Sequence, residues 1–253
     1  MILRSVIEHV KAQHWTAVAL DFLIVVAGVF IGIQVSNFNE ARAFRGRETE
    51  LLTELRRELQ SSIVITDQKS KGMAQVASAA KRSLEFIAGG ASCGNECWPV
   101  LVDFLHASQF QPVLVSRSTY DEMRRLGLPR SRAIVDAVES YLAQNANIAA
   151  TMLIPSYRSL VRQMIPVDAQ EHYWNSCFLL SGGVETYALD CPKGADDDVA
   201  ARIVARIVGN PDIEPTLTEW AGYIAATPQP LKDQNEAAER AIAAIDAELE
   251  RRR

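Results

Sequence analysis

Histidine is scarce in this chain, and so are common catalytic motifs that depend on histidine or paired cysteines. Only four histidines occur among the 253 residues, and two of them, His9 and His14, precede the long apolar stretch described below. Neither the H-E-x-x-H motif of zinc proteases nor the C-x-x-C motif of redox proteins is present. These absences favour a protein that is not an enzyme and that needs no metal or cofactor.

Positive charge and aromatic side chains are also in short supply. The formal net charge is −5 and the pI is near 5.5, whereas nucleic-acid binding usually requires a basic surface that neutralises phosphates. We therefore expect no nucleic-acid partner. Aromatic residues make up only 7% of the chain and alternating, strand-like runs are rare, while Ala, Leu, Glu and Arg recur at helical spacing. The sequence predicts an all-α fold.

Three small groups of residues leave other possibilities open. Asp103 and His106 are three residues apart, which would suit an acid–base pair or two metal ligands, so His106 is the candidate in a distant hydrolase alternative. Glu171 and His172 precede two aromatic residues and could line a ligand pocket. The acidic run at 196–198 could hold calcium, although it lacks the ligand alternation of an EF-hand loop. We expect all three groups to be packed or solvated side chains.

What the chain does contain is one long apolar stretch near its start. It runs from Trp15 to Val35, and its only strongly polar members are Asp21 and Gln34. At about 1.5 Å per helical residue the stretch spans roughly 30 Å, the thickness of the hydrocarbon core of a bilayer. The sequence predicts a single transmembrane helix over residues 15–36, with membrane lipid as its surroundings.

One face of this predicted helix carries small and polar residues. Gly28 and Gly32 form a G-x-x-x-G pair, and Asp21 falls on the same stripe at about 100° per residue. Such a pair lets two helix backbones approach closely, and a partner helix would shield the carboxylate from lipid. These residues predict a homodimer or higher oligomer formed through the membrane helix and the stem that follows it. The alternative is that glycine is simply common in membrane helices and that Asp21 reaches the headgroups unaided.

The segments around the apolar stretch complete the predicted organisation. Residues 1–14 have an apolar and a charged side, as in a helix lying on the membrane surface. A cleaved signal peptide is the alternative, since Ala41-Arg42-Ala43 fits the small-x-small cleavage pattern. Residues 37–66 form an amphipathic stem helix, and residues 67–253 form an irregular helical-bundle domain with two cysteine loops.

Within that domain, turn-forming residues divide the predicted helices. Asp67 to Gly72 should break or bend the stem, and Pro155 should kink a helix that starts near Ile148. The stretch 168–198 is the least regular, with a small hairpin around Gly182-Gly183. The other predicted helices cover residues 73–87, 98–107, 118–126, 131–144, 199–208, 217–226 and 232–253.

The four cysteines fall into two local pairs. Cys93 and Cys97 bracket a short loop, and Cys177 and Cys191 bracket a Ser-Gly-Gly turn, so both arrangements suit disulfides in an oxidising compartment. Zinc binding and free thiols remain alternatives, but the two pairs lie 80 residues apart and lack the short paired spacing of structural zinc sites.

Charge and cysteine content disagree about orientation. Arginines are more frequent after the apolar stretch than before it, which taken alone would keep the large domain in the cytoplasm. Disulfides would place it outside. We expect the N-terminus to lie inside and the domain to lie in the periplasm of a bacterial cytoplasmic membrane.

Two segments resemble an uncharacterised family of bacterial single-pass membrane proteins. The first has an acidic residue before a Val/Ile/Gly-rich membrane helix that ends in Q-x-x-N-x-N-E, here Gln34 to Glu40, although Phe38 stands where the family has Trp. The second is Ser118-Thr119-Tyr120 and the helix that follows. The resemblance implies a helical ectodomain and a single-pass topology. It implies no activity and no catalytic residues.

Together these patterns predict a membrane-anchored, non-catalytic helical protein. It would act as an interaction, scaffold or sensory module that binds an unidentified protein partner. The alternative is a periplasmic ligand-binding sensor that signals through a separate protein, because no signalling domain follows in the sequence.

Overall fold

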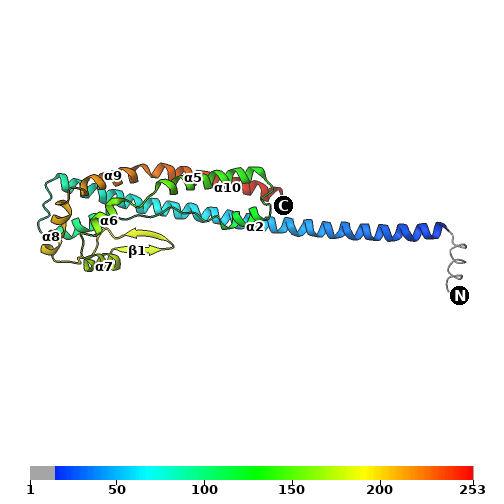
Figure 1. The fold of residues 1–253 in the computed structure, drawn as a ribbon, viewed down its shortest axis with the longest axis horizontal. Helices are drawn as coiled ribbons and strands as arrows, with labels where there is room; N and C mark the ends of the chain where they lie inside the picture. The colour runs from blue at the N-terminus through cyan, green and yellow to red at the C-terminus, as the bar shows by residue number, and fades with distance from the viewer. Residues whose placement is uncertain (1–14, 253) are drawn as a thin grey trace. The chain divides into compact units, whose positions relative to one another are not determined.

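The computed structural model describes the backbone of residues 15–252, and their side chains except those of residues 15–19 and 21 (Figure 1). The predicted interfacial segment, residues 1–14, lies outside the described residues. The contacts divide the chain into two compact units with a boundary between Leu51 and Leu52, and each unit is described by itself below.

The first element, α2 (Trp15–Ala88), is one unbroken helix. The sequence predicts a break or a bend between Asp67 and Gly72, and a break is therefore wrong. Lys69 in this stretch and Thr66 just before it are buried, so tertiary contacts stabilise helical turns that local propensity alone does not favour. Gly72 is tolerated inside the helix because another segment approaches its backbone closely, as described below.

The second unit is mainly helical, as predicted, with one small antiparallel sheet (Figure 1). Beyond the part of α2 that follows Leu51, its elements are α3 (Cys97–Ala107), α4 (Ser118–Arg125), α5 (Arg132–Thr151), α6 (Ser156–Arg162), α7 (Val167–Ser176), β1 (Phe178–Ser181), β2 (Val184–Tyr187), α8 (Asp197–Val208), α9 (Ile213–Ala226) and α10 (Pro228–Arg251).

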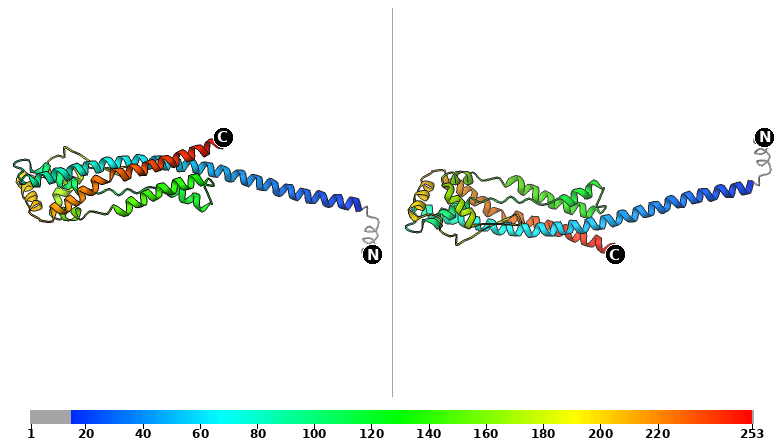
Figure 2. Two further views of the ribbon diagram at one scale, coloured as in Figure 1. Left: turned by 90° about the horizontal axis from the view of Figure 1, so that it is seen from above. Right: turned by 90° about the horizontal axis from the view of Figure 1, so that it is seen from below.

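One part of this unit is a bundle of α2, α5 and α10, which lie side by side in Figure 2. The leucines that recur at three- and four-residue steps on α2 are buried, as are small residues on α10, which allow close packing. An ion pair between Arg56 and Asp246, with the Nε and Oδ1 atoms 2.6 Å apart, links α2 to α10.

A polar layer crosses the middle of the bundle. The side-chain amide of Gln234 on α10 donates to the Thr66 hydroxyl on α2, at 3.2 Å, and its oxygen accepts from Asn145 on α5, at 3.1 Å. Asn145 also donates to the carbonyl of Val113. All three polar side chains are buried, and their mutual hydrogen bonds offset the cost of removing them from water.

The other part of the unit surrounds α3, which is buried along most of its length. α3 lies against α6 and α8, and α9 lies against α6. Side chains such as Trp98, Leu101 and Phe104 form the core there, and α8 contributes the apolar face of Ile203, Val204 and Ile207. This second cluster of helices holds both cysteine loops.

The hairpin predicted around Gly182-Gly183 is present. β1 and β2 pair with Ser181 opposite Val184 and Phe178 opposite Tyr187. Both turn glycines have positive φ, at 59° and 79°, which a two-residue type I′ turn requires and which side chains on both residues would strain.

Candidate functional site

The first part of α2 exposes a large apolar surface. Among the described residues, one helix is long and apolar enough to cross a membrane by length and composition, and none of its apolar window is buried. Phe22 is 71% exposed and Phe30 is 61% exposed. A continuous apolar surface of this length is unfavourable in water, so this segment is a candidate for contact with lipid or with other protein.

The predicted association face lies on this segment. No atom other than neighbouring backbone lies within 4 Å of the position that a Cβ atom would take on Gly28 or Gly32. In this single chain the two glycines therefore leave open the shallow surface that a second helix backbone could occupy. The side chain of Asp21, the third residue of the predicted face, lies outside the description.

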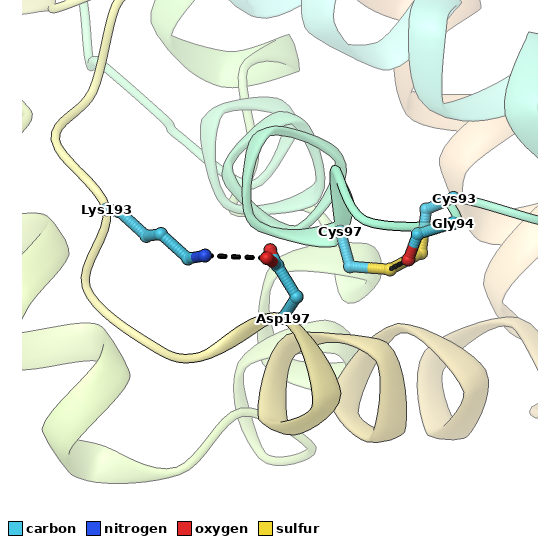
Figure 3. Close-up of a disulfide and its surroundings, with 5 residues drawn as sticks. All are labelled: Cys93, Gly94, Cys97, Lys193 and Asp197. Carbon is cyan, nitrogen blue, oxygen red and sulfur yellow. Dashed lines mark hydrogen bonds and ion pairs between the residues drawn. A yellow bond between two sulfur atoms is a disulfide. The ribbon is translucent and has the colours of Figure 1, made fainter.

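Both predicted cysteine pairs are disulfides. Cys93 is bonded to Cys97 and Cys177 to Cys191, with a Cα–Cα distance of 5.0 Å in each case, and no free cysteine is found in the described chain. Figure 3 shows the first bridge, which lies at the start of α3. No cluster of three or more potential metal ligands occurs among the residues that the structure describes.

The acidic run before α8 is explained by helix formation. Asp197 and Asp198 lie in the first turn of α8, where carboxylates interact favourably with the helix dipole. Lys193 pairs with Asp197 at 2.6 Å (Figure 3), and Arg202 pairs with Asp198 at 2.9 Å. The hydrogen bond from Arg202 lowers the pKa of Asp198. The run behaves as a solvated helix start.

The structure does not bring Asp103 and His106 together as a working pair. Asp103 instead forms a bidentate ion pair with Arg82 of α2. His106 is only 3% exposed and lies between the rings of Tyr173 and Tyr187, with centroids 5.3 and 5.2 Å away. Burial lowers the pKa of His106 to about 4. The imidazole is therefore neutral near pH 7 and out of reach of solvent.

The Glu171-His172 segment lies on α7 beside the second cysteine loop. The His172 ring packs edge-on against Trp98, and its Nε2 atom lies 3.0 Å from the carbonyl oxygen of Pro192. A Cβ atom on Gly194 would lie 2.1 Å from the His172 ring. The histidine is thus a half-buried side chain held by local contacts beside the second cysteine loop.

Two arginines on α6 form a polar centre that the sequence arguments did not identify. Arg158 donates to the carbonyl of Ser108 at 2.8 Å, and Arg162 donates to the Ser108 hydroxyl and to Gln109 Oε1. They bring positive charge to the C-terminal end of α3, where carbonyl groups lack helical partners. Burial and the neighbouring Arg158 lower the pKa of Arg162 to about 10. Its guanidinium also stacks over the Trp174 ring, 4.9 Å from the centroid.

Two glutamines hold the hairpin against the helices. The amide of Gln75 both donates to the carbonyl of Tyr187 and accepts from its N–H, each at 3.2 Å. Gln111 does the same to Glu185, at 2.7 and 3.1 Å. Each side-chain amide therefore replaces the peptide group of a third strand, and the outer edge of β2 is satisfied. The hydrophobic periodicity of the sequence does not predict these contacts, because it assigns glutamine to the surface.

Gly72 makes this arrangement possible. A Cβ atom there would lie 2.4 Å from Nε2 of Gln111 and 2.8 Å from the carbonyl oxygen of Glu185. Glycine is thus needed at this helical position because the hairpin backbone approaches it closely.

We expect Gly72→Ala to destabilise the protein by about 1–2 kcal/mol, because overpacking of about 1–3 kcal/mol exceeds the gain in helix propensity of up to about 1 kcal/mol. Gly222→Ala is the matched control, since Gly222 is also helical but has no atom near its Cβ position. The control should be neutral or stabilised. Urea unfolding of the full chain in detergent measures both, and equal stability of the two variants would contradict the expectation.

A further sequence match is Gly90-Ala91-Ser92-Cys93-Gly94, which fits the G-x-S-x-G pattern of serine hydrolases. That motif normally joins a strand to a helix, whereas here it joins α2 to α3, and Cys93 within it is disulfide-bonded. The described structure records no hydrogen bond from a histidine to Ser92, and His106 on the following helix is buried. The match lacks the structural context of a nucleophile elbow.

Comparisons with protein-family models, curated proteins and solved structures found no match to this chain.

Proposed function

We propose that the chain is a membrane-anchored, non-catalytic helical protein that acts as an interaction, scaffold or sensory module and self-associates through its anchor. The observation that carries the proposal is the apolar part of α2, which none of the described chain covers and which continues without a break into the helical domain. The buried position of His106 and the ion pair that occupies Asp103 support a role without catalysis.

The proposed location is the cytoplasmic membrane of a bacterium, with the N-terminus inside and the domain in the periplasm. The two disulfides support this side of the membrane, because reducing conditions in the cytoplasm oppose stable disulfides. An alkaline phosphatase reporter fused after Arg253 tests the orientation and should be active. An inactive phosphatase, together with an active cytoplasmic reporter at the same position, would overturn the orientation. Recovery of the full-length chain in the soluble fraction without detergent would overturn the anchor itself.

Self-association through Gly28 and Gly32 is tested by filling the open face. The double substitution Gly28→Leu and Gly32→Leu should abolish crosslinked dimers, because leucine side chains keep the two backbones apart. Val26→Leu with Ile33→Leu is the matched control, since these residues lie on other faces of the helix, and it should preserve the dimer. Crosslinking in membranes followed by denaturing electrophoresis gives the readout. Persistence of dimers in the glycine variant at the control level would contradict association through this face.

A ligand-binding sensor is the second candidate function, and one observation favours it. A pocket of about 280 Å³ opens between the α5–α6 connection and α9. It lies close to the lower end of the size range of ligand pockets, and aromatic, aliphatic and hydroxyl side chains line it.

A further inference from the structure

The pocket beside α9 has an aromatic wall. Trp220 and Tyr223 stack with their ring centroids 5.8 Å apart and their planes inclined by only 9°. The indole N–H of Trp220 donates to the carbonyl of Ala107, at 2.8 Å, which fixes the ring in place. The Tyr223 hydroxyl lies 3.4 Å from the Thr151 hydroxyl, so the two sides of the pocket meet there. The wall is thus held rigid before any ligand binds.

The opposite rim is apolar and exposed. Leu153 and Ile154, in the connection between α5 and α6, are 71% and 65% exposed although they lie at the pocket. Two adjacent large aliphatic side chains at the mouth of an aromatic pocket would be covered by the apolar part of a small ligand.

The charge of the pocket has one sign. Among the described residues that line it, Glu219 alone is charged. In the described part of the chain no hydrogen bond or ion pair is recorded for the Glu219 side chain, so its carboxylate is available as an acceptor. A carboxylate in a pocket that aromatic side chains also line favours an ammonium group, because carboxylates and electron-rich rings both attract positive charge.

We propose that this pocket binds a small organic ammonium ion that carries an aromatic or aliphatic group. The ammonium pairs with Glu219, and the apolar group lies between the aromatic wall and the Leu153 rim. The proposal rests on the second candidate function, the ligand sensor, and names the chemical class of its ligand.

Three probes of matched size test the proposal by isothermal titration of the full chain in detergent. They are 2-phenylethylammonium, the neutral 2-phenylethanol and the anion 3-phenylpropionate. We expect the ammonium to bind about tenfold more tightly than the anion, with the alcohol between them. Equal affinity of the ammonium and the anion, or no binding of any probe up to about 10 mM, would overturn the proposal.

Glu219→Gln should weaken binding of the ammonium by about tenfold and leave the alcohol unchanged, because only the charged contact is lost. Glu214→Gln removes a carboxylate from the same helix that does not line the pocket, and it should leave all affinities unchanged. Both variants experience the same partitioning of the probe into micelles. An equal effect of the two substitutions would contradict the assignment of Glu219.

Leu153→Ala provides an independent check, because this exposed side chain can be shortened without disturbing the core. It should weaken the ammonium and the alcohol alike, by about threefold, through loss of apolar cover. An unchanged affinity for both would contradict the role of the rim. Failure of these titrations would overturn the pocket proposal and leave the anchor proposal unaffected. Conversely, a chain that is soluble without detergent and still binds the ammonium would overturn the anchor proposal and leave the pocket proposal unaffected.

Discussion

Replacing Cys177 and Cys191 together with alanine should lower the free energy of unfolding by about 3 kcal/mol. The bridge closes a loop with a sequence separation of 14, and cross-linking a loop of about that length removes about 3 kcal/mol of chain entropy from the unfolded state. The bridge ties the end of α7 to the segment that leads to α8, with the hairpin between them. Gln75 and Gln111 still hold β2 when the bridge is absent, so we expect a loss of stability rather than loss of the fold.

The matched control is the removal of Cys93 and Cys97, whose separation of only 4 predicts a smaller loss of about 2 kcal/mol. Denaturant unfolding of both double variants and of the wild type in detergent gives the comparison. Reduction of the wild-type chain should lower its stability at least as much as the larger of the two losses. Equal stability of the wild type and the Cys177 variant would show that the second bridge does not stabilise the domain.

Acidification should destabilise the domain through His106. The pKa of this histidine is about 4 in the folded state and about 6.5 when exposed, so the unfolded state binds the proton first as the pH falls. The contribution of the neutral His106 to the free energy of unfolding is therefore fully present above about pH 6.5. It decreases as the pH falls below this value and is lost below about pH 4. Between pH 7 and pH 4 the loss amounts to about 3 kcal/mol.

The variant His106→Leu isolates this contribution, since the carboxyl groups titrate in both proteins. Unfolding curves recorded between pH 4 and pH 7 should show a steeper loss of stability in the wild type than in the variant. The variant should also lose little at pH 7, because Nε2 of His106 has no recorded hydrogen-bond partner in the described structure, and a buried polar atom without a partner is unfavourable. Parallel pH profiles would contradict the lowered pKa.

Local patterns predicted much of this fold. The Ser-Gly-Gly turn between Cys177 and Cys191 indicated both the hairpin and the second disulfide, because each depends on residues close in sequence. Helical periodicity predicted α3, α8 and α10 to within a few residues. Pro155 marked a real boundary, but α5 ends before it, at Thr151, and α6 begins after it, so the predicted kinked helix is two helices.

What sequence could not predict depends on distant neighbours. α7 was missed because Trp174 and the cysteines around it suggested an irregular segment, while packing of Tyr173 into the core stabilises a helix there. The segment from Asp67 to Gly72 predicts a break or a bend because nothing in the local sequence indicates the hairpin that packs against Gly72. The sequence also does not predict the pocket beside α9, since Leu153 and Trp220 are 67 residues apart and only the fold brings their elements together.

The hydrogen bonds from the two glutamines to β2 also affect how the protein behaves at high concentration. Where copies of a protein are concentrated, an unpaired strand edge can recruit strands from neighbouring molecules into growing fibrils. Gln75 and Gln111 occupy the hydrogen-bonding groups of Glu185 and Tyr187, so β2 cannot serve as a template. β1 is left with one open edge only four residues long. We therefore expect the sheet to remain within each molecule even when many copies lie close together.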